Sequence, residues 1–169
     1  MAIVASTAIT GCGVSESIRY EHRPSEIFYK DLDINNSVLN PFVDSGILIT
    51  LYIMGVNHDV YDIGVEFYTK DPTKKIYISN VYIFGNSLSK KIEIKKMFIL
   101  NNKVKGSEKI YESRNNLLRF TNIDGKNLER FFDGSNQMHV EVTYIIENKT
   151  KKMSFVINKK TEKRVIFPT

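Results

Sequence analysis

The sequence predicts an all-β protein, a two-layer antiparallel β-sandwich of immunoglobulin-like type with at most one or two short helices. Apolar and polar side chains alternate along most of the chain, which is the period of half-buried strands. Tyr, Ile, Val and Phe, which strands favour, dominate these runs. Turn signals separate the runs at roughly ten-residue intervals, which leaves room for about eight strands. A chain of 169 residues can form one such domain around a single core.

The first strong strand signal is GILITLYIMGV, which carries apolar side chains on both faces. A strand of this kind belongs in the interior of a sheet. Turn signals at Asp71-Pro72-Thr73 and Gly85-Asn86-Ser87 then separate shorter runs of the same composition. The strands expected in this part of the chain cover residues 46–56, 61–70, 75–84 and 91–100.

The C-terminal residues predict an antiparallel meander. In QMHVEVTYII, residues 137–146, the apolar side chains alternate with polar ones, so that one face is buried. A turn at 148–150 precedes a strand at 152–158, and a second polar turn is expected at Asn158-Lys159-Lys160-Thr161. The last strand follows this turn and ends at Pro168.

Two regions interrupt the strand pattern. Residues 27–42 have no clean period and are expected to form a long connection with at most one helical turn. Residues 123–134 have a possible N-cap at Asp124, apolar side chains at helical spacing and a stopping Gly134, which predict a short helix of about two turns.

The N-terminus differs from the rest of the chain. Residues 1–11 carry no charge and are mostly small or apolar, which is typical of the end of a secretory signal, although they are too short to cross a bilayer. The basic beginning of such a signal is missing, so we expect Met1 to lie within a longer natural signal. The prediction is a signal remnant at 1–11, a short polar tether at 12–17 and a single β-sandwich domain at 18–169.

The only cysteine follows this apolar segment directly, in Ile9-Thr10-Gly11-Cys12. These four residues resemble the lipobox of bacterial lipoproteins: an aliphatic residue, a small residue, Gly or Ala, and then the modified cysteine. The resemblance implies cleavage before Cys12 and lipidation of Cys12, which would anchor the protein in a membrane. Because Gly13 rather than Asp follows the cysteine, it also implies the periplasmic face of the outer membrane. The alternative is a free thiol in a cytosolic protein.

No motif for catalysis, cofactors or metals is present. The chain has no G-x-S-x-G elbow and no glycine-rich phosphate loop, and its histidines show no metal-ligand spacing. The paired carboxylates fall in polar stretches where they are expected to form turns. We therefore expect no enzyme, no cofactor and no metal. The residues considered and set aside are His22, His58, His139, Asp31, Asp33, Asp59 and Asp62.

The net charge of +5 comes from the C-terminal part of the chain. Such a patch can attract nucleic acid or anionic surfaces, but in a lysine-rich strand region it is expected to be solvated edges and turns. An exported, anchored protein does not meet nucleic acid, so that partner is excluded. The densest basic stretch comprises Lys149, Lys151, Lys152, Lys159, Lys160, Lys163 and Arg164.

A binding role remains. The expected function is a lipid-anchored outer-membrane lipoprotein whose periplasmic β-sandwich binds a protein partner, as a docking component of an envelope or secretion machine. Two alternatives stay open: an immunity protein that neutralises a toxin delivered to the periplasm, and an envelope enzyme or ligand carrier with a dispersed site. The sequence fixes neither the partner nor the oligomeric state.

Overall fold

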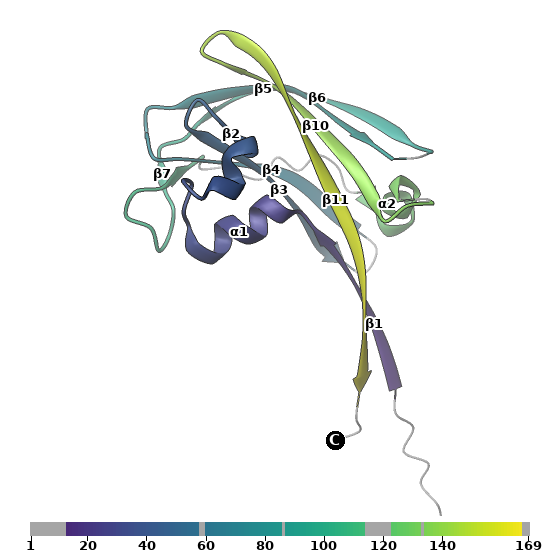
Figure 1. The fold of residues 1–169 in the computed structure, drawn as a ribbon. Coiled ribbons are helices and arrows are strands. Elements are labelled where there is room, and N and C mark those ends of the chain that lie inside the picture. The colour runs from purple at the N-terminus through teal and green to yellow at the C-terminus, as the bar shows by residue number, and fades with distance from the viewer. Residues whose placement is uncertain (1–12, 58–59, 86, 114–122, 133, 167–169) are drawn as a thin grey trace, which may run out of the picture.

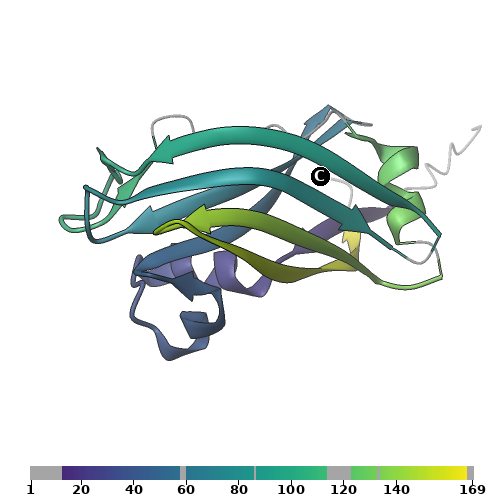
Figure 2. The ribbon, with the colours of Figure 1, turned by 90° about the horizontal axis from the view of Figure 1, so that it is seen from above.

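The computed structural model describes residues 13–57, 60–85, 87–113, 123–132 and 134–166. They form two antiparallel sheets packed face to face, with two α-helices and one 3-10 helix (Figures 1 and 2). The predicted all-β, two-layer antiparallel sandwich with short helices is therefore confirmed.

The first sheet, sheet A, has the order β1-β11-β10-β5-β6. The second, sheet B, has the order β2-β3-β4-β8-β7, and β9 also pairs with β4. Sheet A consists of β1 (Gly13–Glu21), β11 (Lys149–Ile166), β10 (Gln137–Ile146), β5 (Lys75–Phe84) and β6 (Ser89–Ile99). Sheet B consists of β2 (Val43–Asp44), β3 (Ile47–Asn57), β4 (Val60–Thr69), β8 (Tyr111–Glu112), β7 (Asn102–Lys103) and β9 (Ile123–Asp124).

The main core lies between the sheets and follows from the alternation in the sequence. In β10 the even-numbered residues from Met138 to Ile146 are buried, as the pattern of QMHVEVTYII predicts. In β11 the residues that face them are Met153, Phe155 and Ile157, and sheet B contributes Ile49 and other apolar side chains. The strand of residues 137–146 is thus confirmed with its predicted buried face.

A second core covers the outer face of sheet B, which explains why β3 is apolar on both faces. Leu48 of β3 and Tyr68 of β4 lie opposite each other in the ladder and are both buried against Phe28. Phe28 belongs to α1 (Arg23–Asp31), which is followed by the 3-10 helix η1 (Ser37–Phe42). Sheet B is therefore covered by sheet A on one face and by α1 and η1 on the other.

The expectation of a loop at 27–42 is wrong, because this segment contains most of α1 and all of η1. Proline in the first turn favours the start of α1, and Leu32 ends it in the left-handed conformation at φ 48°. The Asn36 side chain accepts a hydrogen bond from the backbone N–H of Val38 and caps η1. Each helix is too short for its few buried side chains to produce a visible period.

The expected turn at Asn158–Thr161 is also wrong. These residues continue β11, which is a single strand of 18 residues. They remain extended because β1 pairs with them, from Ile18 opposite Thr161 to Glu21 opposite Asn158. Pro168 lies outside the described residues.

The same pairing corrects the predicted tether at 12–17, because Gly13–Ser17 form the first half of β1. Beyond Asn158, β11 pairs with β1 alone, since its pairing with β10 ends there. The resulting two-stranded ribbon, Gly13–Tyr20 with Lys159–Ile166, projects away from the sandwich (Figure 1). We call it the β1–β11 ribbon.

The helix α2 (Gly125–Phe131) lies at one end of the sandwich, at the length and position predicted (Figure 2). It buries Leu128 and Phe131 in the main core, with Phe132 just after it. Gly85, directly after β5, permits this close approach, because a Cβ at residue 85 would lie 1.8 Å from the carbonyl oxygen of Phe131.

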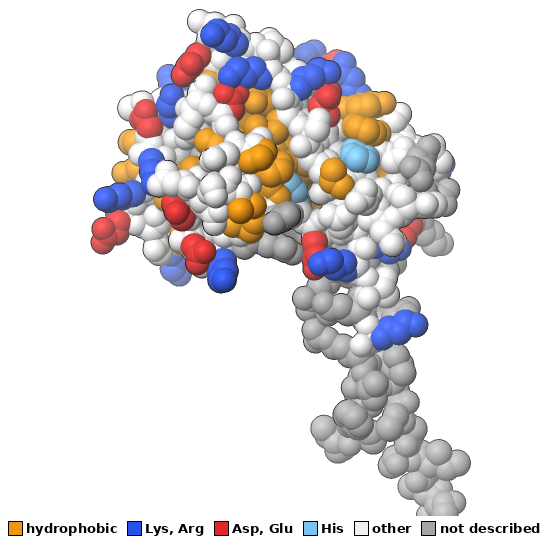
Figure 3. Space-filling view, viewed as in Figure 1, with side chains coloured by type: hydrophobic (Ala, Val, Ile, Leu, Met, Phe, Trp, Pro, Cys, Tyr) orange, Lys and Arg blue, Asp and Glu red, His pale blue; other side chains and the backbone are white. Residues whose placement is uncertain are grey.

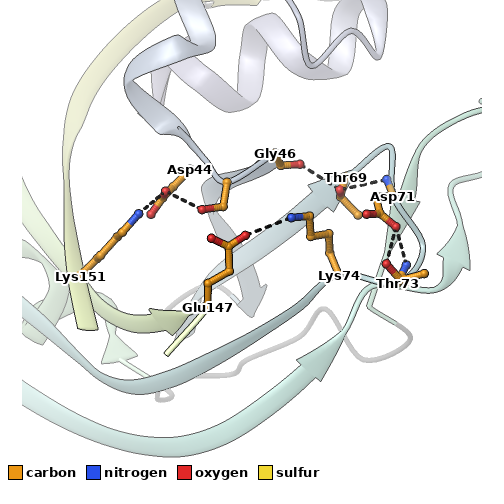
Figure 4. A network of polar contacts seen from close by, with 9 residues as sticks. Asp44, Gly46, Thr69, Asp71, Thr73, Lys74, Glu147 and Lys151 are labelled. Carbon is orange, nitrogen blue, oxygen red and sulfur yellow. Dashed lines mark hydrogen bonds and ion pairs between the residues drawn. The ribbon is translucent and has the colours of Figure 1, made fainter. Parts of the chain in front are cut away.

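At the opposite end, polar contacts join the two sheets. Asp44 of β2 accepts hydrogen bonds from Tyr144 of β10, at 2.9 Å, and from Lys151 of β11, at 2.6 Å. Figure 4 shows Lys151 pointing toward Asp44, and Lys74 pointing toward Glu147 at 3.4 Å. The two Asp44 contacts link the edge strand of sheet B to sheet A, whereas the Lys74–Glu147 pair joins the ends of two strands of sheet A.

Candidate functional site

Cys12 lies outside the described residues, so its lipidation stays a prediction. The described chain begins one residue later, where Gly13 pairs with Ile166. Among the residues that the structure describes, no helix is both long enough and apolar enough to cross a membrane.

His22 follows β1 and is a buried core residue, with 6% of its surface exposed. Its ring lies edge-on to Phe155, at 5.1 Å between ring centres, and to Phe42, at 5.7 Å. Burial lowers the pKa of His22 to about 4, although a hydrogen bond with the backbone of Val156 favours the charged form. A neutral imidazole packed between phenyl rings explains this histidine structurally.

His139, in contrast, lies on the outer face of sheet A. Its ring is stacked on Phe84 of β5, with 5.2 Å between ring centres and 12° between planes, and the two residues are opposite each other in the ladder. Phe84 is in turn stacked on Tyr82, at 5.2 Å and 30°. Val156 of β11 lies opposite His139 on its other side. We call Tyr82, Phe84, His139 and Val156 the aromatic row.

The aromatic row is accessible to solvent. Tyr82 is 36% exposed and Val156 is 39% exposed, whereas their neighbours along the strands, Ile83 and Phe155, are buried in the main core. Figure 3 shows hydrophobic side chains next to a histidine on the surface. Contiguous exposed apolar side chains on a sheet face are typical of interaction sites.

Charged side chains border the aromatic row. Lys91 of β6 and Glu141 of β10 lie opposite Tyr82 on its two sides in the ladder. Glu141 is paired with Lys152 at 2.8 Å, but no ion pair is found for Lys91 within the described ranges. Lys91 therefore provides a positive charge at this border with which a partner can interact.

The predicted carboxylate pairs have structural roles or lie outside the described residues. Asp31 and Asp33 are exposed, and Asp33 accepts a hydrogen bond from the backbone N–H of Asn35, as a turn residue does. Asp62 lies in β4, opposite Met54. His58 and Asp59 are not described. Within the described ranges, no three or more His, Cys, Asp or Glu side chains are grouped so that they could hold a metal ion.

Carboxylates from other elements accompany much of the basic stretch. All of its residues lie on β11, and Lys151, Lys152, Lys159 and Lys160 form ion pairs with described residues. Lys151 is paired with Asp44 and Lys152 with Glu141. The other two pairs are Lys159 with Glu129 and Lys160 with Glu21. The expectation that these lysines protect a strand edge is therefore wrong, because β11 lies between β1 and β10, and the lysines are instead balanced by neighbouring carboxylates.

A polar cluster also lies beneath α1. The hydroxyl of Tyr29 donates to the Glu66 carboxylate and lies 2.8 Å from the hydroxyl of Tyr68. Burial raises the pKa of Glu66, hydrogen bonds from Tyr29 and Tyr68 oppose this, and the nearby Glu112 carboxylate adds to the rise. The cluster fixes α1 on sheet B.

Sequence reasoning treated His139 only as a possible metal ligand and did not find the aromatic row. The sequence does place aromatic side chains on the solvent-facing side of two predicted strands. Tyr82 and Phe84 lie on one strand, and His139 lies on the other. Only the register of β5 against β10 shows that these positions are neighbours.

Comparisons with known proteins found no matching family, no matching curated protein and no matching solved structure.

Proposed function

We propose that this chain is a lipid-anchored lipoprotein at the periplasmic face of the outer membrane, where its sandwich binds a protein partner as a docking component of an envelope or secretion machine. The observation that carries the binding role is the aromatic row. Aromatic side chains that are ordered by stacking provide contact area with little loss of side-chain entropy on binding.

The borders of the aromatic row define the chemistry of the partner. Tyr82 and Val156 offer apolar surface, and Lys91 beside Tyr82 offers a positive charge that forms no ion pair among the described residues. The complementary surface carries an apolar or aromatic side chain next to an Asp or Glu. Such a pairing places the apolar contact at the centre and the charge at the rim of the interface.

The compartment rests on the resemblance of Ile9-Thr10-Gly11-Cys12 to a lipobox. It is tested with the gene carrying a complete export signal, in cells fed labelled palmitate. We expect the wild type to take up label and to fractionate with membranes, and Cys12→Ser to lose both properties. An unlabelled, cytosolic wild type would contradict the proposed anchor.

The docking face is tested by site-specific photocrosslinking in envelopes of the native host. A photoreactive residue at Tyr82 is compared with one at Tyr29, which is 49% exposed but lies on α1, over sheet B. We expect Tyr82 to crosslink to one envelope protein and Tyr29 not to reach it. Lys91→Glu, on the same face, should remove the crosslink.

Reconstitution with the crosslinked protein decides the outcome. Binding should weaken at least tenfold in Tyr82→Ser, and Lys91→Glu should be rescued by reversing one carboxylate on the partner. Equal crosslinking from Tyr82 and Tyr29, or full affinity in Tyr82→Ser, would contradict the docking face. If the crosslinked protein is a toxin, the role is immunity and docking in a machine is refuted.

A further inference from the structure

A pocket of about 650 Å³ lies at the end of the sandwich, beside α2 and separate from the aromatic row. The end of α2, the turn at Gly134–Asn136 and Lys159 of β11 form its walls. Its volume falls within the range of roughly 300–1,000 Å³ that is usual for small-molecule sites. Most of its lining side chains are polar or charged, so the pocket suits a hydrophilic ligand.

One wall is fixed by contacts from three elements. Lys159 continues the inward series of Phe155 and Ile157, and its ammonium group contacts one carboxylate oxygen of Glu129 on α2. The other oxygen of Glu129 accepts a hydrogen bond of 3.0 Å from Tyr20 of β1. This wall therefore holds its shape without a ligand.

The one large apolar side chain of the described lining is Phe132. It is buried, and its ring lies 5.3 Å from the ring of Tyr20, between ring centres. The Tyr20 hydroxyl reaches Glu129 at the same time, so that Tyr20 contacts two lining residues. This contact holds Phe132 and Glu129 in place beside each other.

Two lining side chains keep unused hydrogen-bonding capacity. Arg130 is exposed, and within the described ranges its guanidinium group forms no ion pair. The backbone carbonyl of Asn136 accepts a hydrogen bond from the backbone N–H of Lys159, while its side-chain amide forms no hydrogen bond with a described residue. By contrast, Ser135 already bonds the backbone of Gln137 twice.

We infer that this pocket binds a small hydroxylated carboxylate, an acidic sugar. The guanidinium of Arg130 offers two parallel donors to the carboxylate. The amide of Asn136 and the remaining lone pairs of Glu129 bind sugar hydroxyl groups. Because Lys159 and Glu129 neutralise each other, Arg130 supplies the net positive charge of the described lining residues, which favours an anion over a neutral sugar.

The test is an NMR titration of the whole chain carrying Cys12→Ser with D-glucuronate, D-glucose and acetate. We expect glucuronate to shift the backbone amide signals of Arg130, Asn136 and Lys159 in a saturable way. D-Glucose, which lacks the carboxylate, and acetate, which lacks the hydroxyl groups, should each bind at least tenfold more weakly.

Two variants with matched loss of one positive charge locate the site. Arg130→Gln should weaken glucuronate binding at least tenfold. Lys103→Gln removes an exposed charge on β7, at the far side of the molecule from α2, and should leave it unchanged (Figure 1). Both variants alter exposed side chains, and their thermal unfolding is measured to verify the fold.

Three results would overturn the inference. They are the absence of saturable shifts with glucuronate, equal binding of glucuronate and either control compound, and equal loss of binding in Arg130→Gln and Lys103→Gln. None of them bears on the aromatic row, so the proposed function and this pocket are tested independently.

Discussion

The imidazole ring of His22 lies edge-on to the phenyl ring of Phe155, with 5.1 Å between ring centres and 81° between planes. This contact fills the space between β11 of sheet A and the helical layer, where Phe42 of η1 is stacked on the same phenyl ring at 5.5 Å. An ionisable ring therefore forms part of an aromatic core.

Stability should depend on the protonation of His22. Burial lowers the pKa of His22 from 6.5 to about 4. Between pH 6.5 and pH 4, His22 is therefore protonated in the unfolded state but neutral in the folded state. The free energy of unfolding is therefore highest above pH 6.5 and falls as the pH is lowered toward 4, by on the order of 3 kcal/mol. Urea titrations at several pH values measure this.

The His22 contribution is isolated by comparison with His22→Phe, which removes the titrating group and keeps a ring. The difference in the free energy of unfolding between wild type and variant should change between pH 6.5 and pH 4 and stay constant above pH 6.5. A wild type and a His22→Phe variant with parallel pH profiles would contradict the prediction.

Gly85→Ala should strongly destabilise the protein. The new Cβ would lie 1.8 Å from the carbonyl oxygen of Phe131, and a backbone atom cannot move aside without shifting α2. We expect a loss of about 3 kcal/mol or more in the free energy of unfolding. Gly106→Ala is the control, because its Cβ meets nothing within 4 Å and only its φ of 85° opposes the change, at about 1 kcal/mol. Equal losses in the two variants would show that α2 does not pack as described.

Asp44→Ala should cost about 1–3 kcal/mol, because it leaves the hydroxyl of Tyr144 buried without its acceptor. Lys152→Ala, which breaks the exposed pair with Glu141, should cost less than about 1 kcal/mol. Chemical unfolding at neutral pH compares them. A cost for Asp44→Ala no larger than that for Lys152→Ala would refute the role of this contact.

Acid should act on Asp44 as well. Burial alone would raise its pKa, but hydrogen bonds from Lys151 and Tyr144 outweigh burial and lower the pKa below 3.8. Its stabilising contribution is therefore complete above pH 3.8 and is lost as the pH falls below that value. In Asp44→Asn this part of the acid transition should be absent.

The second core is tested by Phe28→Ala. Phe28 is fully buried between α1 and sheet B, with its ring centre 4.3 Å from that of Tyr68. We expect a loss of about 3–5 kcal/mol. Val38→Ala, at a position of η1 that is 43% exposed, should change stability by less than about 1 kcal/mol. Thermal unfolding of the two variants distinguishes a packed helical layer from a loose one.

The elements that the sequence predicts well are those whose environment is periodic. Residues 137–146 alternate because one face of β10 meets the main core, and α2 is visible because Leu128 and Phe131 are three residues apart. In α1, by contrast, His22 is the N-cap and makes no side-chain capping bond, and Leu32 is the C-cap, so the capping residues that usually mark the two ends of a helix are missing.

The remaining errors come from long-range pairing. Asn158–Thr161 look like a turn because they are polar, yet they remain extended because β1, more than a hundred residues away in sequence, pairs with them. The aromatic row is hidden for the same reason, since β5 and β10 are neighbours in space only. Local patterns carry no information on either contact.

The β1–β11 ribbon has a mechanical consequence for the proposed anchor. Its eight residue pairs from Gly13 to Tyr20 span about 25 Å at roughly 3.3 Å per residue. A lipid on Cys12 would be attached next to a hydrogen-bonded two-stranded ribbon and not to a flexible linker. If Cys12 carries the proposed lipid, such a ribbon would hold the sandwich at a set height above the bilayer and limit its rotation, so that the aromatic row would be presented in one direction.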